Sequence, residues 1–331
     1  MNPSIAEIFT NKSVLITGGI GFIGSSLARR LVGMGAMVTV LDSMVPEYGG
    51  NKFNLVGMEQ FLRINISDMR DPYSISFLVD GQDYLFNLAG QTSHMESMSD
   101  PLTDLHINVT SQVSLLEACR RLNSNIRIVF LSTRQIYGLS RYLPVDELHP
   151  EDPVDVNGIN KLASEKYHIL YSKMYNMQCS ILRLTNTYGP RMRIKDARQM
   201  FLGYWLRQLL EDKPFQVWGG EQYRDFTFVE DVVDAILLCA SATSANGCVF
   251  NLGGPEVMTL KELADQLIAV NRGGFYNIVS FPENRKKIDI GDFYCNFNKI
   301  RNTLGWHPQT TILEGLERTL EYYRENMRYY I

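Results

Sequence analysis

The sequence predicts an α/β fold, a doubly wound parallel sheet followed by a smaller C-terminal α/β domain. Short β-branched runs alternate with helical patterns through the first half of the chain, as in successive βαβ units. A glycine-rich stretch directly after the first apolar run is typical of a strand-to-helix turn in such a sheet. The 331 residues are 45% hydrophobic, which is enough for about two domains with buried cores.

Strands are expected where short apolar runs end at polar or turn-forming residues. They are predicted at 13–17, 37–41, 84–88, 126–131, 179–184 and 249–253. Helices are predicted from the glycine-rich stretch to Gly33, and over about 101–122, 157–175 and 226–240. The helix over 101–122 is indicated by apolar residues at helical spacing, namely Leu105, Val109, Val113, Leu116 and Cys119.

The character of the sequence changes after Gly189-Pro190. The following segments are irregular and rich in Arg, Gly and aromatic residues, as in 191–198 and 218–220. We therefore expect the first domain to comprise residues 1–189, with 226–255 returning to it. Residues 190–225 and 256–331 are expected to form the second domain.

Composition excludes several function classes. The net charge of −4, from 32 basic and 36 acidic residues, argues against a nucleic-acid binder. No apolar run approaches the length of about 18 residues that a membrane span needs. The first ten residues do not resemble a signal peptide, and the five scattered cysteines lack a C-x-x-C pair. We expect a cytoplasmic protein with reduced thiols, no membrane partner and, because no histidines stand at i and i+4, no metal site.

The glycine-rich turn points to a dinucleotide. Gly18, Gly21 and Gly24 stand at G-x-x-G-x-x-G spacing between a predicted strand and a predicted helix. In a Rossmann-type fold, such glycines allow a tight turn, close approach of the backbone to the pyrophosphate and close helix–strand packing. The helix N-terminus then faces the phosphates.

Asp42 selects the kind of dinucleotide. It closes the second strand, where a carboxylate accepts hydrogen bonds from the two ribose hydroxyls of NAD and repels the extra phosphate of NADP. No arginine follows it directly to bind that phosphate. NAD is therefore the expected cofactor.

Beyond this turn, the chain resembles the extended short-chain dehydrogenase/reductase family, particularly its nucleotide-sugar epimerases and dehydratases such as the UDP-glucose 4-epimerase-like members. The resemblance covers nearly the whole length, and it depends on the order and spacing of its motifs. They are Asp68-Met69-Arg70-Asp71, Asn87-Leu88-Ala89-Gly90, Ser132-Thr133 with Tyr137-Gly138, Lys161, the R-x-x-N-x-Y-G-P segment 183–190, Arg224-Asp225-Phe226 with Val229 and Asp231, and the L-G-W-x-P segment 304–308.

The resemblance implies an NAD-binding domain over 1–189 with 226–255, and a sugar-nucleotide-binding domain over 190–225 and 256–331. The residues expected at the cofactor are Gly18, Gly21, Phe22, Ile23, Gly24, Asp42, Ser43, Asp68, Met69, Leu88, Ala89, Gly90, Ser132, Lys161 and Leu184. Those expected at the substrate are Gln91, Asn186, Arg224 and, from a basic cluster with Lys286 and Lys287, Arg285. Phe215 and Trp218 are further candidates for contact with the base or the sugar, or else aromatic core.

The catalytic residues implied by the resemblance are Thr133, Asn157 and Lys161, and one of them departs from the pattern. The family has a tyrosine four residues before its lysine, and this tyrosine removes a proton from a sugar hydroxyl as hydride passes to NAD. Here that position is Asn157, which is no Brønsted base near neutral pH, although its amide can bind a hydroxyl. Three explanations stay open. The chain is a variant of an active epimerase, another group (Thr133, Tyr137, His94 or Glu96) is the base, or the protein binds its ligands without turnover.

The strand end after Thr133 favours epimerisation. Dehydratases of the family resemble S-T-D-E-V-Y-G there, and decarboxylases commonly carry a glutamate, whereas this chain has Arg134 and Gln135. We therefore expect a nucleotide-sugar epimerase that forms a transient keto-sugar, acting at C4 of a UDP-sugar. The alternatives are a dehydratase or decarboxylase, or an NAD-sensing or scaffold protein without a reaction. Arg134 is either a solvent-facing loop residue or a contact to an anionic substrate group such as a uronate.

The predicted helices over 101–122 and 157–175 carry apolar residues on more than one face. By resemblance, these helices would pair with their copies in a four-helix interface, which predicts a homodimer. The alternative is that both faces are buried within one subunit.

Overall fold

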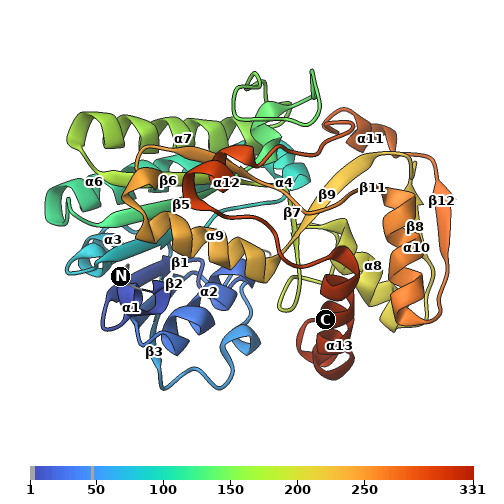
Figure 1. Ribbon diagram of the computed structural model, residues 1–331, viewed down its shortest axis with the longest axis horizontal. Helices are drawn as coiled ribbons and strands as arrows, with labels where there is room; N and C mark the ends of the chain where they lie inside the picture. The colour runs from blue at the N-terminus through green and yellow to red at the C-terminus, as the bar shows by residue number, and fades with distance from the viewer. Residues whose placement is uncertain (1–3, 46–47) are drawn as a thin grey trace.

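The computed structural model describes residues 4–45 and 48–331, apart from the side chains of residues 284 and 285. A seven-stranded parallel sheet forms its larger part (Figure 1), in the order β10-β6-β5-β4-β1-β2-β3. The strands are β1 (Ser13–Thr17), β2 (Met37–Asp42), β3 (Leu62–Ile66), β4 (Tyr84–Asn87), β5 (Arg127–Thr133), β6 (Gln178–Leu184) and β10 (Val249–Leu252). This order confirms the predicted Rossmann-type, doubly wound fold.

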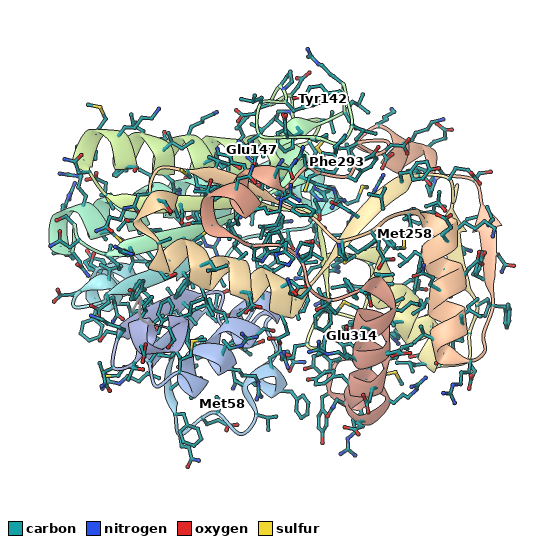
Figure 2. The ribbon with its side chains drawn as sticks, viewed as in Figure 1. Met58, Tyr142, Glu147, Met258, Phe293 and Glu314 are labelled. Atoms are coloured by element: carbon teal, nitrogen blue, oxygen red, sulfur yellow. The ribbon has the colours of Figure 1, made fainter. Side chains whose placement is uncertain are left out.

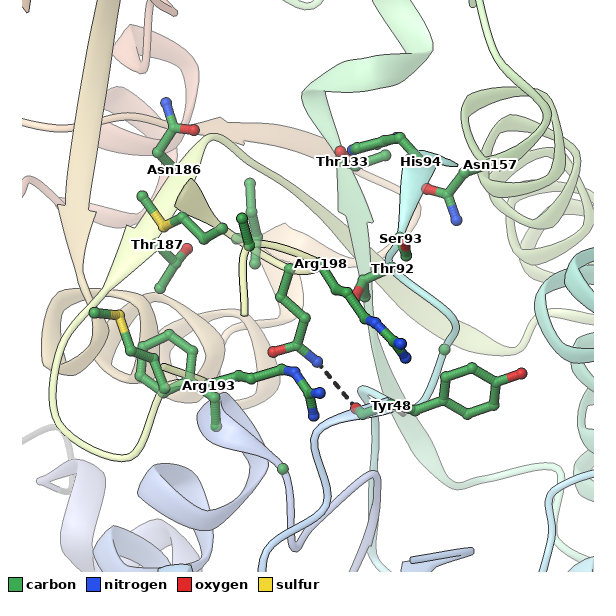
Figure 3. A pocket seen from close by; sticks show the side chains of 18 of the residues that line it. Tyr48, Thr92, Ser93, His94, Thr133, Asn157, Asn186, Thr187, Arg193 and Arg198 are labelled. Carbon is green, nitrogen blue, oxygen red and sulfur yellow. Dashed lines mark hydrogen bonds between the residues drawn. The ribbon is translucent and has the colours of Figure 1, made fainter. Parts of the chain in front are cut away.

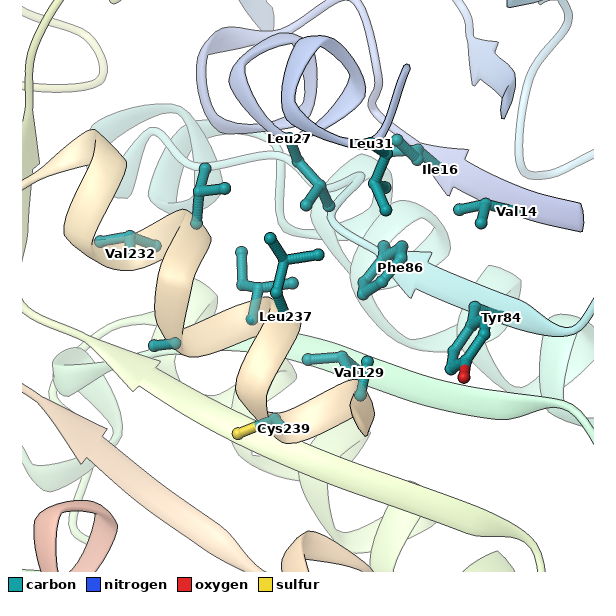
Figure 4. Packing of buried hydrophobic residues seen from close by; sticks show 14 of the residues in the cluster. Val14, Ile16, Leu27, Leu31, Tyr84, Phe86, Val129, Val232, Leu237 and Cys239 are labelled. Carbon is teal, nitrogen blue, oxygen red and sulfur yellow. The ribbon is translucent and has the colours of Figure 1, made fainter. Parts of the chain in front are cut away.

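Helices cover both faces of the sheet, so its strands are buried on both sides. In β1, Val14 and Ile16 pack into one core while Leu15 packs into the other, because successive side chains of a strand point to opposite faces. The helices α2 (Phe22–Gly33) and α9 (Val229–Ser241) cover the first face (Figure 4). The helices α3 (Pro72–Val79), α6 (Ser111–Leu122) and α7 (Val156–Tyr175) cover the second.

The long helix predicted over 101–122 is interrupted. It consists of α5 (Pro101–Leu105), a π-helical turn η3 (His106–Thr110) and α6. The Ser111 hydroxyl donates to the Ile107 carbonyl at 2.6 Å within this stretch. The wider turn brings the buried side chain of Asn108 toward Gly90, beside the site described below.

Two elements near the N-terminus were not predicted. They are the short helix α1 (Ile5–Phe9), which packs on α9, and the edge strand β3. Only Leu62 of β3 is buried, so this strand lacks the alternation that marks a half-buried strand.

The smaller part has its own core between two short sheets and three helices. Its elements are β7 (Asn186–Tyr188), α8 (Phe201–Leu210), β8 (Phe215–Trp218), β9 (Tyr223–Phe228), β11 (Val257–Thr259), α10 (Leu260–Asn271), β12 (Tyr276–Val279), α11 (Glu283–Lys286) and α13 (Ile312–Asn326). The chain returns from it to the main sheet through α9 and β10, and α12 (Asn298–Leu304) packs on β10.

A small buried cluster joins the two parts. Phe293, labelled in Figure 2, packs against Tyr137 with ring centroids 6.1 Å apart, and Ile136, Val145 and Ile290 complete the contact. Within the ranges that the structure describes, no helix is long and apolar enough to cross a membrane.

Candidate active site

One cavity of about 1000 Å³ lies at the carboxyl ends of the parallel strands, between the sheet and the smaller part. Figure 3 shows part of its lining. Most of the predicted site residues line it, namely Gly18, Gly21, Phe22, Ile23, Gly24, Asp42, Ser43, Asp68, Met69, Leu88, Ala89, Gly90, Ser132, Thr133, Asn157, Lys161, Leu184, Asn186 and Arg224. Residues spread over two hundred positions of sequence thus meet at one site.

The turn between β1 and α2 has no room for side chains. Gly18 has a φ of +68°, and a Cβ there would lie 2.9 Å from the Ala89 Cα. A Cβ on Gly24 would lie 2.2 Å from the Gly18 carbonyl oxygen. Gly21 precedes α2 without a side-chain cap, so the first N–H groups of the helix are left for a phosphate.

Asp42 stands at the end of β2 with a fixed carboxylate. Its Oδ2 accepts from the Ile20 N–H at 3.0 Å and its Oδ1 from the Met44 N–H at 2.9 Å. Burial raises the pKa of this carboxyl, and the two backbone donors oppose that shift. Each oxygen keeps a lone pair for a ribose hydroxyl, so the glycine turn and Asp42 together fit NAD.

Lys161 lies deeper in the cavity, on α7. Its Nζ donates to the Leu131 carbonyl at 3.3 Å and lies 5.0 Å from the centroid of the Phe130 ring. Burial lowers the pKa of Lys161 to about 8, while the charges of Asp104 and Glu165 oppose that shift. The ammonium is therefore mostly protonated at neutral pH and can hold a ribose hydroxyl.

Asn157 lines the cavity one helical turn before Lys161, and its amide is largely used within the protein. Nδ2 donates to the Gln91 carbonyl at 2.8 Å and to Asp104 Oδ2 at 3.1 Å. Asp104 is buried and also accepts from Asn160 Nδ2 at 2.7 Å. Asn157 therefore offers a sugar only its oxygen, as a hydrogen-bond acceptor.

The end of β5 supplies two hydroxyls. The Thr133 Oγ1 accepts from the Gln135 N–H at 3.2 Å, which leaves its own proton for donation. The Ser132 Oγ is buried and has no hydrogen-bond partner among the described residues. Buried polar atoms usually have partners, so an unpaired hydroxyl in this cavity is suited to a ligand.

Three basic and polar residues line the other end of the cavity. Asn186 Nδ2 donates to the Asp225 carbonyl at 2.9 Å, and its Oδ1 accepts from Arg134 Nη1 at 2.8 Å. Arg224 is buried, donates to the Tyr223 and Gly291 carbonyls, and lies 3.4 Å from Asp289. Burial lowers the pKa of Arg224, but its guanidinium stays charged at neutral pH.

A family model described as the NAD dependent epimerase/dehydratase family matches residues 14–253. The chain belongs to this family. The match confirms the family that the motifs indicated, NAD as the cofactor and an enzymatic role.

Individual relatives of this family agree over nearly the whole chain. The protein is 30% identical to a putative UDP-glucose 4-epimerase of Methanocaldococcus jannaschii, over 95% of this chain and 99% of the relative. UDP-glucose 4-epimerase from Thermotoga maritima, solved with UDP-glucose, has a TM-score of 0.86 and 27% identity, covering 95% and 99% of the two chains. DesIV, a dTDP-glucose 4,6-dehydratase from Streptomyces venezuelae solved with NAD, has a TM-score of 0.86 and 26% identity, covering 96% and 98%.

Two of the residues predicted to contact the substrate, Gln91 and Arg285, are not among those that line the cavity. Gln91 is 2% exposed and lies outside the cavity lining, because its amide turns back to donate to the Ser93 carbonyl at 3.0 Å. Its carbonyl accepts from Asn157 Nδ2 at 2.8 Å, and its contact with the substrate stays a prediction. The side chain of Arg285 lies outside the described residues.

The structure also removes two of the candidate bases. Tyr137 is fully buried, donating to Asn251 Oδ1 at 2.7 Å and accepting from Arg183 Nη1 at 2.7 Å, and burial raises its pKa further. Glu96 lines the cavity but is paired with Arg198 at 3.0 Å. Tyr137 lies outside the cavity lining and cannot reach the reacting proton, whereas Glu96 keeps free lone pairs but is bound to Arg198.

Part of the cavity lining was not predicted from the sequence. Arg193, Asp196 and Arg198 reach the cavity from the irregular stretch after Gly189-Pro190. The Arg-rich composition of that stretch was the available signal. Phe215 and Trp218 also line the cavity, but Phe215 is buried in the core of the smaller part, as the alternative of aromatic core predicted. The structure, over residues 4–45 and 48–331, brings together no cluster of His, Cys, Asp and Glu that could hold a metal ion.

Proposed function

We propose that the protein is an NAD-dependent nucleotide-sugar epimerase that acts at C4 of a UDP-sugar through a transient keto-sugar. The observation that carries this proposal is the continuous cavity at the carboxyl ends of the strands. It joins a dinucleotide end, with the glycine turn, Asp42 and Lys161, to a polar end with Asn186 and Arg224. A nucleotide sugar bound along it places its sugar between the two ends.

Elimination and decarboxylation are less well supported than epimerisation. Gln135, at the position where those enzymes carry an acid, is neutral, and its Nε2 donates to Asp155 Oδ2 at 2.9 Å and to the Ile288 carbonyl at 3.3 Å. A neutral amide held in this way cannot move a proton to a leaving group. Epimerisation needs only hydride transfer, a proton acceptor at one hydroxyl and rotation of the keto-sugar.

The roles of the chain's residues follow from their places in the cavity. NAD, when bound, supplies the chemistry of accepting a hydride from the sugar carbon and returning it. Lys161 holds the nicotinamide ribose and adds positive charge near the reacting oxygen. Thr133 donates its hydroxyl proton to that oxygen, and Asn157 accepts from a neighbouring sugar hydroxyl. Asn186 and Arg224 hold the diphosphate, for which a charged guanidinium is well suited.

The two-domain division belongs to the same proposal. Residues 1–189 with 226–255 would bind NAD, and 190–225 with 256–331 would bind the nucleotide sugar. The support is that β10 lies in the main sheet, whereas β8, α8 and α10 surround a separate core.

A homodimer is also proposed, formed through α5, α6 and α7. Along α7, apolar side chains at helical spacing stay exposed, namely Ile159, Tyr167, Leu170 and Met174. Leu102 and Leu105 of α5 and Leu122 of α6 are exposed as well. A second copy of the chain that packs against these helices in a four-helix interface would bury the exposed apolar side chains of both copies.

We also propose that the protein acts in the cytoplasm, in carbohydrate biosynthesis. The five free cysteines, four of them buried, are consistent with a reducing compartment.

The test is turnover. The NAD-loaded protein is incubated with UDP-, GDP-, CDP- and dTDP-sugars, and the products are followed by proton NMR. Inversion at C4 of a UDP-sugar is expected. Loss of water or carbon dioxide would support the dehydratase or decarboxylase alternative. Binding without any product would support a protein impaired in catalysis by Asn157.

A further inference from the structure

We propose that His94, paired with Asp155, is the proton acceptor and donor for the sugar hydroxyl, in place of the missing tyrosine. The proposal rests on the proposed epimerase function and adds a catalytic group to it. It is carried by an imidazole–carboxylate pair at the wall of the cavity.

The Asp155 carboxylate is buried and firmly held. Its Oδ1 accepts from the Gly158 N–H at 2.6 Å, as the N-cap of α7, and its Oδ2 accepts from Gln135 Nε2 at 2.9 Å. The third neighbour is His94 Nδ1, 2.8 Å from Oδ2. The carboxylate thus accepts from two neutral donors and has one imidazole nitrogen close by.

His94 lines the cavity and lies beside the buried Asp155 carboxylate. Its Nδ1 is buried 2.8 Å from Asp155 Oδ2, although the two atoms do not meet the geometry of a hydrogen bond, and the side chain as a whole is 36% exposed. In Figure 3, His94 lies on the same side of the cavity as Thr133 and Asn157. A carboxylate this close to Nδ1 favours a proton on that nitrogen, which would leave the lone pair of Nε2 to accept a proton from a sugar hydroxyl.

Other groups near Asn157 are less suitable. Asp104 is buried and accepts hydrogen bonds from the amides of Asn157 and Asn160. Tyr137 is buried outside the cavity lining, and Glu96 forms an ion pair with Arg198. Lys161 is required as a cation. Of the candidate bases considered, His94 alone combines exposure to the cavity with an orienting carboxylate.

The proton balance of the proposed step is simple. The hydroxyl O–H bond breaks as Nε2 takes the proton, while the carbon loses a hydride to bound NAD and becomes a ketone. After the keto-sugar rotates, the hydride returns to the other face and the imidazolium gives its proton back to the oxygen. The histidine and the cofactor both end in their starting states, so no further oxidant or reductant is needed.

The test compares variants of the full-length, NAD-loaded protein. His94→Gln is expected to lower kcat by about 10²–10⁴-fold, the usual effect of losing a positioned acid/base. Asp155→Asn keeps an N-cap side chain and should also lower kcat, because the tautomer of His94 is no longer fixed. The exposed His307→Gln is the matched control and should leave kcat unchanged.

Rescue and spectroscopy make the test specific. In the His94→Gln background, Asn157→Tyr should restore turnover, because a tyrosine there supplies another base. Nitrogen-15 NMR should show the Nδ1–H tautomer for His94, and this signal should change in Asp155→Asn. Full activity of His94→Gln, or an Nε2–H tautomer, would overturn this proposal alone. No turnover by the unaltered protein with any nucleotide sugar would overturn the proposed function and this proposal with it.

A second, independent observation concerns Arg134, from which we infer that the sugar carries a carboxylate. This inference deepens the proposed function by naming the substrate class as UDP-uronates. Arg134 lines the cavity, and its Nε is buried without a hydrogen-bond partner in the described part of the chain. Its Nη1 donates to Asn186 Oδ1 at 2.8 Å, and the centroid of the Phe293 ring lies 5.9 Å from the guanidinium carbon.

The charges around Arg134 favour an anion there. Burial and, to a smaller extent, the neighbouring charge of Arg224 lower the pKa of Arg134 to about 10. Asp225 and Asp289 oppose this shift, but neither forms an ion pair with Arg134 among the described side chains. Arg224 is assigned to the diphosphate, so the planar fork of Arg134 is left for a second anionic group, and a carboxylate matches its geometry.

Binding measurements distinguish a failure of this inference from a failure of the proposed function. Dissociation constants are measured for UDP, a UDP-hexose and the corresponding UDP-uronate with the NAD-loaded protein and with Arg134→Gln. The unaltered protein should prefer the uronate, and the variant should lose about tenfold or more in affinity for the uronate alone. Equal losses for all three ligands would place Arg134 at the diphosphate and overturn the inference. Failure of the unaltered protein to bind UDP or either sugar would instead overturn the proposed function.

Discussion

At position 161, a lysine ammonium is buried in a cavity where the carboxylates of Asp104 and Glu165 attract it. Its pKa of about 8 lies below the value of about 10.4 that is usual for an unfolded chain. Between these values the unfolded protein binds more protons, so the free energy of unfolding rises with pH across that window. Below it, the buried charge costs stability.

Lys161→Met should therefore stabilise the fold at pH 7, by on the order of 2 kcal/mol. Urea unfolding of the cofactor-free protein at pH 7 and pH 10 measures this difference, which should shrink at the higher pH. A variant that is less stable than the unaltered protein at both pH values would contradict the expectation.

The affinity for NAD should change with pH in the opposite direction, because NAD binding uses the charged form of Lys161. Loss of the Lys161 proton above pH 8 removes a donor and a positive charge, so affinity for NAD should fall as pH rises from 7 to 9. Fluorescence titration with NAD at several pH values tests this. Lys161→Met serves as the control, since its affinity should be low and nearly independent of pH in this range.

The site residues that belong to a sequence motif were the easiest to predict. The glycine turn, Asp42, Thr133 and Lys161 could be predicted because each is part of a motif tied to one strand end. The hydrogen bond from the Gln91 amide to the Ser93 carbonyl could not be predicted, because it depends on the local conformation of the backbone. The contact between His94 and Asp155 was not predictable, because it joins the first residue of α4 (His94–Ser99) to the N-cap of α7, and only the finished fold brings these two helix ends together.

At the scale of the element, two glycines of α2, Gly24 and Gly33, differ in the space around them and allow a test with an internal control. Gly24→Ala would place a Cβ 2.2 Å from the Gly18 carbonyl, so the first turn of the helix must move away from β1. A loss of about 1–3 kcal/mol in the free energy of unfolding is expected, with weaker NAD binding. Gly33→Ala, at the other end of the same helix, meets no atom within 4 Å.

Gly33→Ala should leave NAD affinity unchanged and stabilise the protein by up to about 1 kcal/mol, because alanine favours helix. Calorimetry and NAD titration of both variants test the pair. Similar behaviour of the two variants would show that the turn tolerates a side chain.

The predictability of an element depended on its burial. The strands with both faces covered stood out as apolar runs, and α7 was predicted within one residue at its start. β3 was missed because it is an exposed edge strand. The π-helical turn at His106–Thr110 was not foreseen, since the apolar residues on either side keep a nearly regular helical spacing.

At the scale of the whole molecule, the exposed stripe on α7 predicts the state of association. Leu170→Glu puts a charge into the proposed four-helix interface and should convert a dimer to a monomer, measured by light scattering. Leu148→Glu is the control, because Leu148 is 88% exposed and lies outside these helices. A monomeric unaltered protein, or a dimer that survives Leu170→Glu, would contradict the interface.

The position of β10 beside β6 has a consequence for synthesis on the ribosome. β6 ends at residue 184 and its partner begins at residue 249, after residues 190–225 of the smaller part have been made. At about 5–20 residues per second, the outer edge of β6 waits roughly 3–13 s for the strand that covers it. During that interval its unpaired backbone can pair with a neighbouring nascent chain. Slow translation between these two strands should therefore increase aggregation, whereas a pause after residue 252 should not.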